Sequence, residues 1–262
     1  MAVRAGLNSQ CGCSFVEQED YRADMAVPFM SFRVFLNHDL AQVFFSQFLE
    51  NPMQSSSIIS TETGLQLPVM EQFYTIQGEG AHTGTAAYFI RLAGCDVGCV
   101  WCDVKESWST EGYPVLNVEG LARVAQETGT EVVVVTGGEP AMYNLEALTA
   151  ELNSRKLRTH IETSGAHPIT GKWDWVCFSP KKFKKPLDGA YEKADELKVV
   201  IYNKSDFKWA ETHAEKVRKD CLLYLQPEWG KADDMMPLIT AYVKENPRWK
   251  ISLQTHKYLG IP

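Results

Sequence analysis

The sequence predicts an α/β fold, namely a partial (βα)6-type TIM barrel in which helices cover a parallel sheet. Short apolar runs alternate with amphipathic segments at intervals of about 25 residues, which indicates repeated βα units. Runs such as Val132–Val135 are apolar on both faces, as is typical of strands in a parallel sheet. The units are too few for an eight-stranded closed barrel, so we expect an open one.

Strands are expected at the apolar runs Ala86–Leu92, Glu131–Thr136, Arg158–Glu162, Trp175–Ser179, Glu196–Ile201, Leu222–Gln226 and Lys250–Leu253. Helices are expected at the segments Val118–Thr128 (with Asn117 as its cap), Leu145–Lys156, Asp206–Lys219 and Met235–Glu245. In sheets of this kind, ligands bind beyond the carboxyl ends of the strands. The motifs described below follow those ends.

Residues 1–64 differ from the rest of the chain and are expected to form a weakly ordered N-terminal extension. Phe29–Leu49 is rich in Phe and is compatible with a short amphipathic helix, and Asn51–Thr63 has the Ser and Thr content of a linker. Met53 is a reasonable alternative start, which would make the extension an artefact. The catalytic domain is expected to span residues 65–262.

The composition is that of a globular protein with a sizeable core: 262 residues, 45% apolar and 23% charged. Its net charge of −7 argues against nucleic-acid binding. No apolar stretch reaches the roughly 18 residues of a membrane span, and there is no secretory signal, so a cytoplasmic protein is expected. The basic cluster Lys181–Lys185 is either a solvated loop or a contact for an anionic ligand.

Three cysteines, Cys95, Cys99 and Cys102, are crowded into eight residues with the spacing C-x3-C-x2-C. Thiolates are soft ligands that suit iron–sulfur clusters or zinc. Three of them leave one iron of a four-iron cube free to chelate a substrate, whereas structural zinc needs a fourth Cys or His close by. The flanking Gly94 and Gly98 suit a loop that wraps a cube, because glycine adopts backbone angles closed to other residues.

The other cysteines carry less information. Cys11 and Cys13 lie in the extension and are expected to be inert, and Cys177 and Cys221 lie in or next to strands, where buried thiols are common. No second set of closely spaced cysteines is present, which argues against an electron-transfer protein. A structural zinc site and chance core cysteines remain the alternatives for the triad.

The triad, with an aromatic residue before its last cysteine, resembles the signature of the radical SAM superfamily. A second mark of this superfamily, Gly137-Gly138-Glu139-Pro140, follows the next strand. The resemblance implies that Cys95, Cys99 and Cys102 hold a [4Fe–4S] cluster that cleaves S-adenosylmethionine (SAM). It also implies that the Gly137–Pro140 segment contacts the SAM amino group.

Further motifs, in the same order, resemble those of the 7-carboxy-7-deazaguanine synthase family over residues 68–262. They are Phe73–Gly80, Phe89–Leu92, Glu162–Gly165, Ser179–Lys181, Leu225–Pro227 and Gln254–Pro262. Members of this family convert 6-carboxy-5,6,7,8-tetrahydropterin to 7-carboxy-7-deazaguanine, a step toward queuosine and other deazapurines. The resemblance also implies a flavodoxin- or ferredoxin-type reductant and a homodimer.

The resemblance further implies two sets of binding residues. The pterin substrate is expected to contact Ile76, Gln77, Gly78, Arg91, Thr136, His256 and the terminal carboxylate of Pro262. SAM is expected to contact Trp101, Asp103, Gly138, Ser179, Pro180, Lys181 and Gln226. These residue types suit such ligands, since an amide pairs with the donor–acceptor edge of a pterin and an arginine offers a planar fork to a carboxylate.

Structural roles are the alternatives for several of these residues. Arg91 is alternatively a salt-bridge partner at the end of the sheet, His256 a satisfied core histidine and Gln77 a turn residue. Glu79 and Glu162 either bind a ligand or hold loops.

One position departs from the family pattern. The residue after the last cysteine and its aspartate is often Thr or Ser in the family, and its hydroxyl helps to bind Mg²⁺ beside the substrate and SAM. In this chain the position is Val104, which has no side-chain oxygen. Either the ion is held by substrate, water and Asp103, or this chain depends on Mg²⁺ less.

Two other functions are the rivals to this reading. One is another radical SAM enzyme, such as a glycyl-radical activating enzyme, which would need a protein partner. The other is a zinc-stabilised binding module, which would be colourless and would not cleave SAM.

Overall fold

The computed structural model describes residues 63–262, so the predicted extension 1–64 lies outside it except for its last two residues. The expectations for Cys11, Cys13 and Phe29–Leu49 lie outside it as well. The described chain forms a nine-stranded sheet in the order β3-β1-β2-β4-β5-β6-β7-β8-β9. The strands are β1 Gln66–Ile76, β2 Ala86–Leu92, β3 Val115–Asn117, β4 Val132–Gly137, β5 Arg158–Thr163, β6 Trp175–Phe178, β7 Glu196–Ile201, β8 Leu222–Pro227 and β9 Trp249–Ile251.

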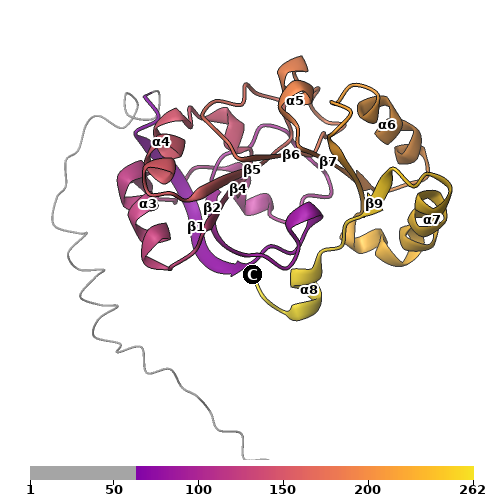
Figure 1. The fold of residues 1–262 in the computed structure, drawn as a ribbon, viewed down its shortest axis with the longest axis horizontal. Helices are drawn as coiled ribbons and strands as arrows, with labels where there is room; N and C mark the ends of the chain where they lie inside the picture. The colour runs from indigo at the N-terminus through magenta and orange to yellow at the C-terminus, as the bar shows by residue number, and fades with distance from the viewer. Residues whose placement is uncertain (1–62) are drawn as a thin grey trace, which may run out of the picture. The chain divides into compact units, whose positions relative to one another are not determined.

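Helices cover the outer, convex side of the curved sheet (Figure 1). They are α3 Val118–Glu127, α4 Glu146–Ser154, α5 Asp188–Lys193, α6 Ser205–Ala214 and α7 Ala232–Glu245. β1 pairs antiparallel with β2 and β3, and all later neighbours pair in parallel. The sheet does not close, because β3 and β9 stand at opposite ends of the strand order. The predicted open α/β barrel is confirmed.

Local sequence explains why α3 begins and packs where it does. The side chain of Asn117 caps it by accepting a hydrogen bond of 2.6 Å from the backbone N–H of Gly120, as predicted. Such a cap is worth about 1 kcal/mol. The helix buries one stripe, formed by Val118, Leu121, Ala122 and Ala125. This spacing is that of one helix face, which packs on the sheet.

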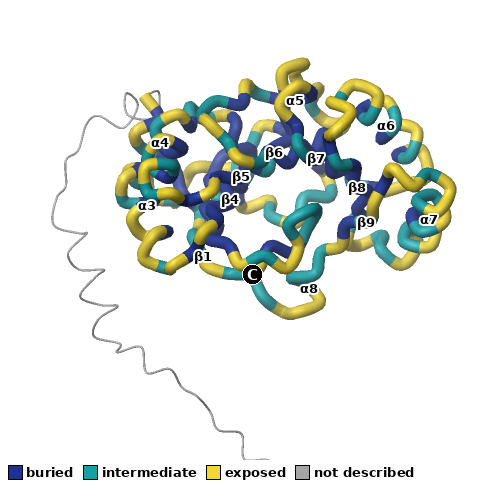
Figure 2. The backbone as a smooth tube through the Cα atoms, viewed as in Figure 1, coloured by how far each residue is buried: buried dark blue, intermediate teal, exposed yellow. Residues whose placement is uncertain are grey.

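The two-residue period of the strands decides which side chains reach the interior of the barrel. In β2, Ile90 and Leu92 pack in the core beneath the helices, whereas Arg91 faces the interior. In β7, Leu197 packs outward and Lys198 inward in the same way. Figure 2 shows the buried residues concentrated along the sheet and the exposed ones on the outer helices.

All predicted strands and helices are present, with ends that differ by a few residues. The largest difference is in α6, which ends at Ala214 rather than at Lys219. The sequence analysis missed β1, β3, α5 and the short helix α8 (Thr255–Leu259). β1 was missed because, as an antiparallel strand outside the parallel core, it has several half-exposed positions and no continuous apolar run. No helix in residues 63–262 is long and apolar enough to cross a membrane.

The segment after β9 connects the two ends of the open sheet. The backbone N–H of Thr255 donates to the carbonyl of Gly78 at 2.9 Å, just beyond the end of β1. Farther along, the hydroxyl of Thr75 donates to a carboxyl-group oxygen of Pro262 at 3.2 Å. Helix α8 and the end of the chain therefore lie across the gap between β1 and β9 (Figure 1).

Candidate active site

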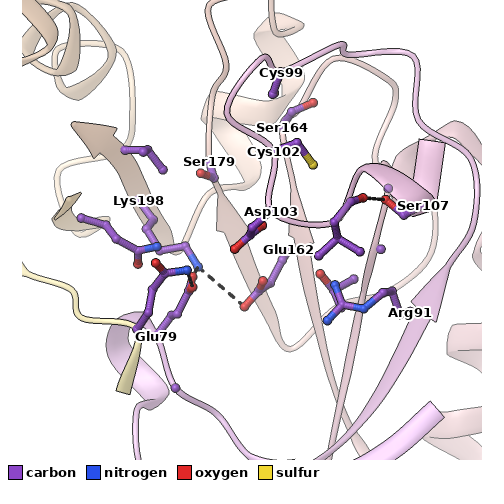
Figure 3. A pocket seen from close by; sticks show the side chains of 18 of the residues that line it. Glu79, Arg91, Cys99, Cys102, Asp103, Ser107, Glu162, Ser164, Ser179 and Lys198 are labelled. Atoms are coloured by element: carbon purple, nitrogen blue, oxygen red, sulfur yellow. Dashed lines mark hydrogen bonds and ion pairs between the residues drawn. The ribbon is translucent and has the colours of Figure 1, made fainter. Parts of the chain in front are cut away.

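A cavity of about 520 Å³ lies at the carboxyl ends of the parallel strands (Figure 3). It gathers every residue predicted as a site residue except Pro180. Those that line it are Ile76, Gln77, Gly78, Arg91, Cys95, Cys99, Trp101, Cys102, Asp103, Thr136, Gly138, Ser179, Lys181, Gln226, His256 and Pro262. Pro180 lies between two lining residues and does not itself line the cavity. Residues from almost every strand thus meet in one space.

The cysteine loop follows β2 and is held by backbone hydrogen bonds. The N–H of Gly94 donates to the carbonyl of Ser107 at 2.7 Å, and the N–H of Cys102 donates to the carbonyl of Cys99 at 3.0 Å. Gly98 has a φ of +74°, a left-handed conformation that favours glycine. The three cysteines are free thiols that face the same cavity.

This donor set fits an iron–sulfur cube better than a single ion. Within residues 63–262, no group of three or more His, Cys, Asp or Glu side chains is arranged to hold one metal ion, which disfavours a structural zinc site. A cube does not need such convergence, because each thiolate binds a different iron. Cys99 is buried with Val97 and Ala166, and Cys95 and Cys102 pack against them, so the thiols have the apolar surroundings in which clusters are held.

Burial favours the protonated form of two of these thiols, Cys99 and Cys95. It raises the pKa of Cys99 to about 11, although the Lys181 ammonium acts in the opposite direction. Burial also raises the pKa of Cys95. Cluster assembly must therefore release protons, and we conclude that it is favoured by raised pH.

The Gly-Gly-Glu-Pro segment after β4 lies directly against the cysteine loop. The N–H of Gly138 donates to the carbonyl of Leu92 at 3.0 Å, and the N–H of Glu139 donates to the carbonyl of Gly94 at 2.9 Å. A Cβ on Gly138 would lie 2.3 Å from the oxygen of Gly94 and 2.8 Å from the Cβ of Cys95. Only glycine fits there, because any side chain would displace the cysteine loop.

Glu139 joins the ends of β4 and β5. Its side chain is 1% exposed and accepts hydrogen bonds from the backbone N–H groups of Ala141 at 3.0 Å and Ser164 at 2.8 Å. It also accepts from the hydroxyls of Thr163 and Ser164. The carboxylate thus fixes two loops that line the cavity.

The basic cluster Lys181–Lys185 divides between the cavity and the surface. Lys181 faces the cavity, where its ammonium donates to the carbonyl of Ser179 at 2.8 Å and lies 5.8 Å from the ring centre of Trp101. Burial lowers the pKa of Lys181. Lys182 instead pairs with Asp206, and Lys184 pairs with Asp96.

The opposite side of the cavity holds a network of charged and amide groups. The amide of Gln77 donates to Glu162 at 2.9 Å, and its oxygen accepts from the backbone N–H of Glu79 at 3.0 Å. Gln77 therefore stabilises the turn that precedes Glu79 and also contacts Glu162 inside the cavity. Glu79 also accepts from the amide of Gln254 at 3.0 Å.

Lys198 is at the centre of this network, and the sequence analysis missed it. It extends inward from β7, with its ammonium 2.5 Å from Glu79 and 3.7 Å from Glu162 (Figure 3). Its side chain is only 5% exposed. Burial opposes the charge of Lys198, but the surrounding acidic groups outweigh this and raise its pKa well above its usual range. The signal in the sequence was a lysine within the otherwise apolar stretch Leu197–Ile201.

The ion pair with Lys198 makes stability depend on pH in the acid range. Burial alone would raise the pKa of Glu79, but Lys198 and the hydrogen bonds lower it from 4.5 to about 2. The stabilisation is thus complete above about pH 4.5 and is lost as the pH falls toward 2. We expect Glu79→Gln to be less stable than the wild type above pH 4.5, with the difference shrinking toward pH 2.

Urea unfolding at a series of pH values measures this difference. A difference between the two proteins that stays constant from pH 6 to pH 2 would contradict the assigned ion pair. Glu131→Gln is the control, because the carboxylate of Glu131 is 86% exposed and lies 3.6 Å from Arg158 on the surface, away from the cavity.

Arg91 and His256 complete this side of the cavity. The guanidinium of Arg91 donates through Nε to Glu71 at 2.6 Å, which is the salt bridge expected if Arg91 had a structural role. Arg91 also lines the cavity, so the two roles are compatible. His256 is half-buried and lies against Gly78, where a Cβ would be 2.2 Å from the imidazole Nδ1. Burial lowers the pKa of His256. Glycine at position 78 thus permits the approach of α8.

Comparisons with known proteins agree with this arrangement. Residues 89–176 match the Radical SAM superfamily. The 7-carboxy-7-deazaguanine synthases of Flavobacterium psychrophilum and Synechocystis sp. are 57% and 47% identical to this chain. Each alignment covers 78% of this chain and 97% of the relative. A crystal structure of QueE from Escherichia coli matches with a TM-score of 0.66 and 31% identity, over 76% of this chain and 99% of that one.

The open barrel and its cysteine loop, together with the family match, define a radical SAM protein. SAM and a [4Fe–4S] cluster are the cofactors that this class implies. Within the superfamily, the chain belongs to the 7-carboxy-7-deazaguanine synthase family.

Proposed function

We infer that this chain is a 7-carboxy-7-deazaguanine synthase that converts 6-carboxy-5,6,7,8-tetrahydropterin to 7-carboxy-7-deazaguanine by radical ring contraction. The observation that carries this inference is one cavity lined on one side by the cysteine loop and on the other by Gln77, Arg91 and His256. A glycyl-radical activating enzyme would have to admit a segment of another protein. Here the C-terminal segment lies across the open side of the barrel, which favours a small substrate.

We propose that Cys95, Cys99 and Cys102 hold the cluster, which when bound supplies the electron that cleaves SAM. The SAM contacts are proposed to be Trp101, Asp103, Gly138, Ser179, Pro180, Lys181 and Gln226. The Lys181 ammonium suits the carboxylate of the methionine part. Pro180 would act indirectly, by shaping the turn that presents its two neighbours to the cavity.

The proposed pterin contacts are Ile76, Gln77, Gly78, Arg91, Thr136, His256 and Pro262. Arg91 suits the substrate carboxylate, because its salt bridge with Glu71 uses Nε and leaves the terminal N–H groups of the guanidinium for a ligand. The carboxylates of Glu79 and Glu162 are acceptors for the N–H groups of the pterin. Burial alone would raise the pKa of Glu79, but Lys198 outweighs this effect and lowers it, and the pairing of Lys198 with both carboxylates fixes their orientation.

The C-terminal segment is proposed to exclude water from the reacting atoms. Its bonds from Thr255 to Gly78 and from Thr75 to Pro262 tie it to the end of β1. Radical chemistry needs such shielding and a fixed geometry. For the cell, we propose a flavodoxin- or ferredoxin-type reductant, a cytoplasmic homodimer and a role in queuosine biosynthesis.

The test is an anaerobic assay of the reconstituted protein with SAM, dithionite and 6-carboxy-tetrahydropterin. Chromatography follows 5′-deoxyadenosine and 7-carboxy-7-deazaguanine together, and we expect both to accumulate. Deoxyadenosine without the deazapurine would retain the radical SAM class and overturn the substrate. Neither product, from a protein that binds zinc rather than iron, would overturn the proposal altogether.

A further inference from the structure

The residues around Asp103 do not fit a protein-held Mg²⁺. Mg²⁺ demands oxygen ligands in near-octahedral geometry. Val104 follows Asp103 along the cavity wall and offers no side-chain oxygen. Within residues 63–262, no three His, Cys, Asp or Glu side chains are arranged to hold a metal ion. Of the carboxylates in the cysteine loop, Asp103 lines the cavity, whereas Asp96 pairs with Lys184 and does not line it.

A cation from the protein already lies at this carboxylate. The Lys257 ammonium is 2.8 Å from Oδ2 of Asp103. The same ammonium lies 4.9 Å from the ring centre of Trp229, at a distance typical of a cation–π contact. The side chain of Lys257 is 21% exposed, against 58% for Asp103, so the lysine is the more firmly held of the two.

Lys257 and Asp103 come from two different elements that line the cavity. Lys257 belongs to α8, in the segment that Thr255 ties to Gly78 at the substrate side of the cavity. Asp103 belongs to the cysteine loop on the other side. The pair therefore connects the cysteine loop, which carries proposed SAM contacts, to the C-terminal segment, which carries proposed pterin contacts.

The other cations of the cavity pair with other residues. The ammonium of Lys198 is buried between Glu79 and Glu162, and Arg91 pairs with Glu71 through Nε, which leaves its terminal N–H groups for a ligand. Lys181 bonds to Ser179 beside the cysteine loop. Lys257 is thus the cation that pairs with Asp103, and this one ion pair leaves further N–H donors of its ammonium for a ligand carboxylate.

We propose that Lys257 takes the place of a divalent cation in this chain. Its ammonium bridges Asp103 and one oxygen of the substrate carboxylate, whose other oxygen accepts from Arg91, so turnover needs no Mg²⁺. This inference rests on the proposed function. An ammonium has three donors, enough to serve both carboxylates at once and to orient one against the other.

The experiment uses the reconstituted holoenzyme, treated with EDTA and desalted, and measures turnover of SAM and 6-carboxy-tetrahydropterin with and without millimolar MgCl₂. We expect the two rates to agree within about twofold. A stimulation of tenfold or more by Mg²⁺ would overturn the inference. A second readout is independent of turnover: Mn²⁺, followed by electron paramagnetic resonance, should show no saturable binding to the enzyme with SAM and substrate. Saturable Mn²⁺ binding at one site would overturn the inference.

Substitutions test the role of Lys257 itself. Lys257→Met keeps the apolar stem against Trp229 and removes the charge, and we expect its KM for the pterin to rise by about 10- to 100-fold, as for loss of a charge-assisted hydrogen bond. Lys257→Arg keeps the charge and should stay within about fivefold of the wild type. Equal loss in both variants, or no loss in either, would overturn the assignment.

The failure of this inference is distinguishable from failure of the proposed function. Product that forms only with Mg²⁺ retains the synthase and overturns the role of Lys257. Absence of the deazapurine under every metal condition overturns the synthase and, with it, the substrate carboxylate that Lys257 would bind.

Discussion

Replacing Cys99 with alanine is expected to abolish both cluster binding and product formation. Cys99 is the most deeply buried of the three cavity cysteines and lies in the centre of their loop. Without its thiolate, only two protein ligands remain for the cube, which is too few to hold it against loss of iron. The measurements are iron and sulfide content after reconstitution, the visible absorption of the cluster, and the assay described above.

A matched control is available in the same chain. Cys221 is also a free, buried cysteine, but it does not line the cavity. Cys221→Ala should therefore keep the iron content and turnover of the wild type. Full iron content in Cys99→Ala would contradict the assignment of the triad, and equal loss in both variants would point to a general effect on folding.

Lys198→Met is expected to lose nearly all turnover and much of the stability of the fold. Methionine fills a similar volume but leaves Glu79 and Glu162 close together without their cation. Breaking a buried ion pair by removing one partner costs about 3–5 kcal/mol of unfolding free energy. Activity falls for a second reason, because unpaired carboxylates gain protons or reorient and no longer present fixed acceptors to the substrate. Urea unfolding and the product assay measure the two effects.

Two further variants separate these effects. Combining Lys198→Met with Glu79→Gln removes one of the stranded charges, so stability should recover in part while turnover stays low. Lys250→Met, on the exposed face of β9, is the surface control and should change neither quantity. If the turnover rate of Lys198→Met stayed within about threefold of the wild-type rate, a role for Lys198 in the site would be contradicted. A threefold change in rate corresponds to less than the roughly 1.4 kcal/mol of a tenfold change.

The parallel sheet was predictable because its signals are local. Val132–Val135 forms β4 and is fully buried, as an apolar run bounded by a loop on each side indicates. The cap at Asn117 and the apolar stripe of α3 are also readable from neighbouring residues. β1 was not predicted, since many of its side chains are half-exposed and one of its two pairing partners, β3, is distant in the chain, with Gln66 opposite Asn117.

The cysteine loop and most site residues were likewise predictable, because they lie in short motifs with strict spacing. The predicted residues meet in one cavity, with Pro180 as the exception. Lys198 and Lys257 were not assigned to the site. Although Lys198 is unusual in its apolar stretch, nothing local in the sequence identifies a partner for either lysine, because each acidic partner lies in a distant part of the chain.

By itself, the sequence determined the class of fold, the spacing of the cysteine triad and the family to which the chain belongs. These depend on periodicity and spacing, which are properties of residues close together in the chain. Only the tertiary structure decided which charges pair: Lys198 with Glu79, Lys257 with Asp103, and Arg91 with Glu71. The reason is physical, since the energy and pKa of a buried charge depend on groups brought near it by other strands, and the folding of the sheet alone brings them together.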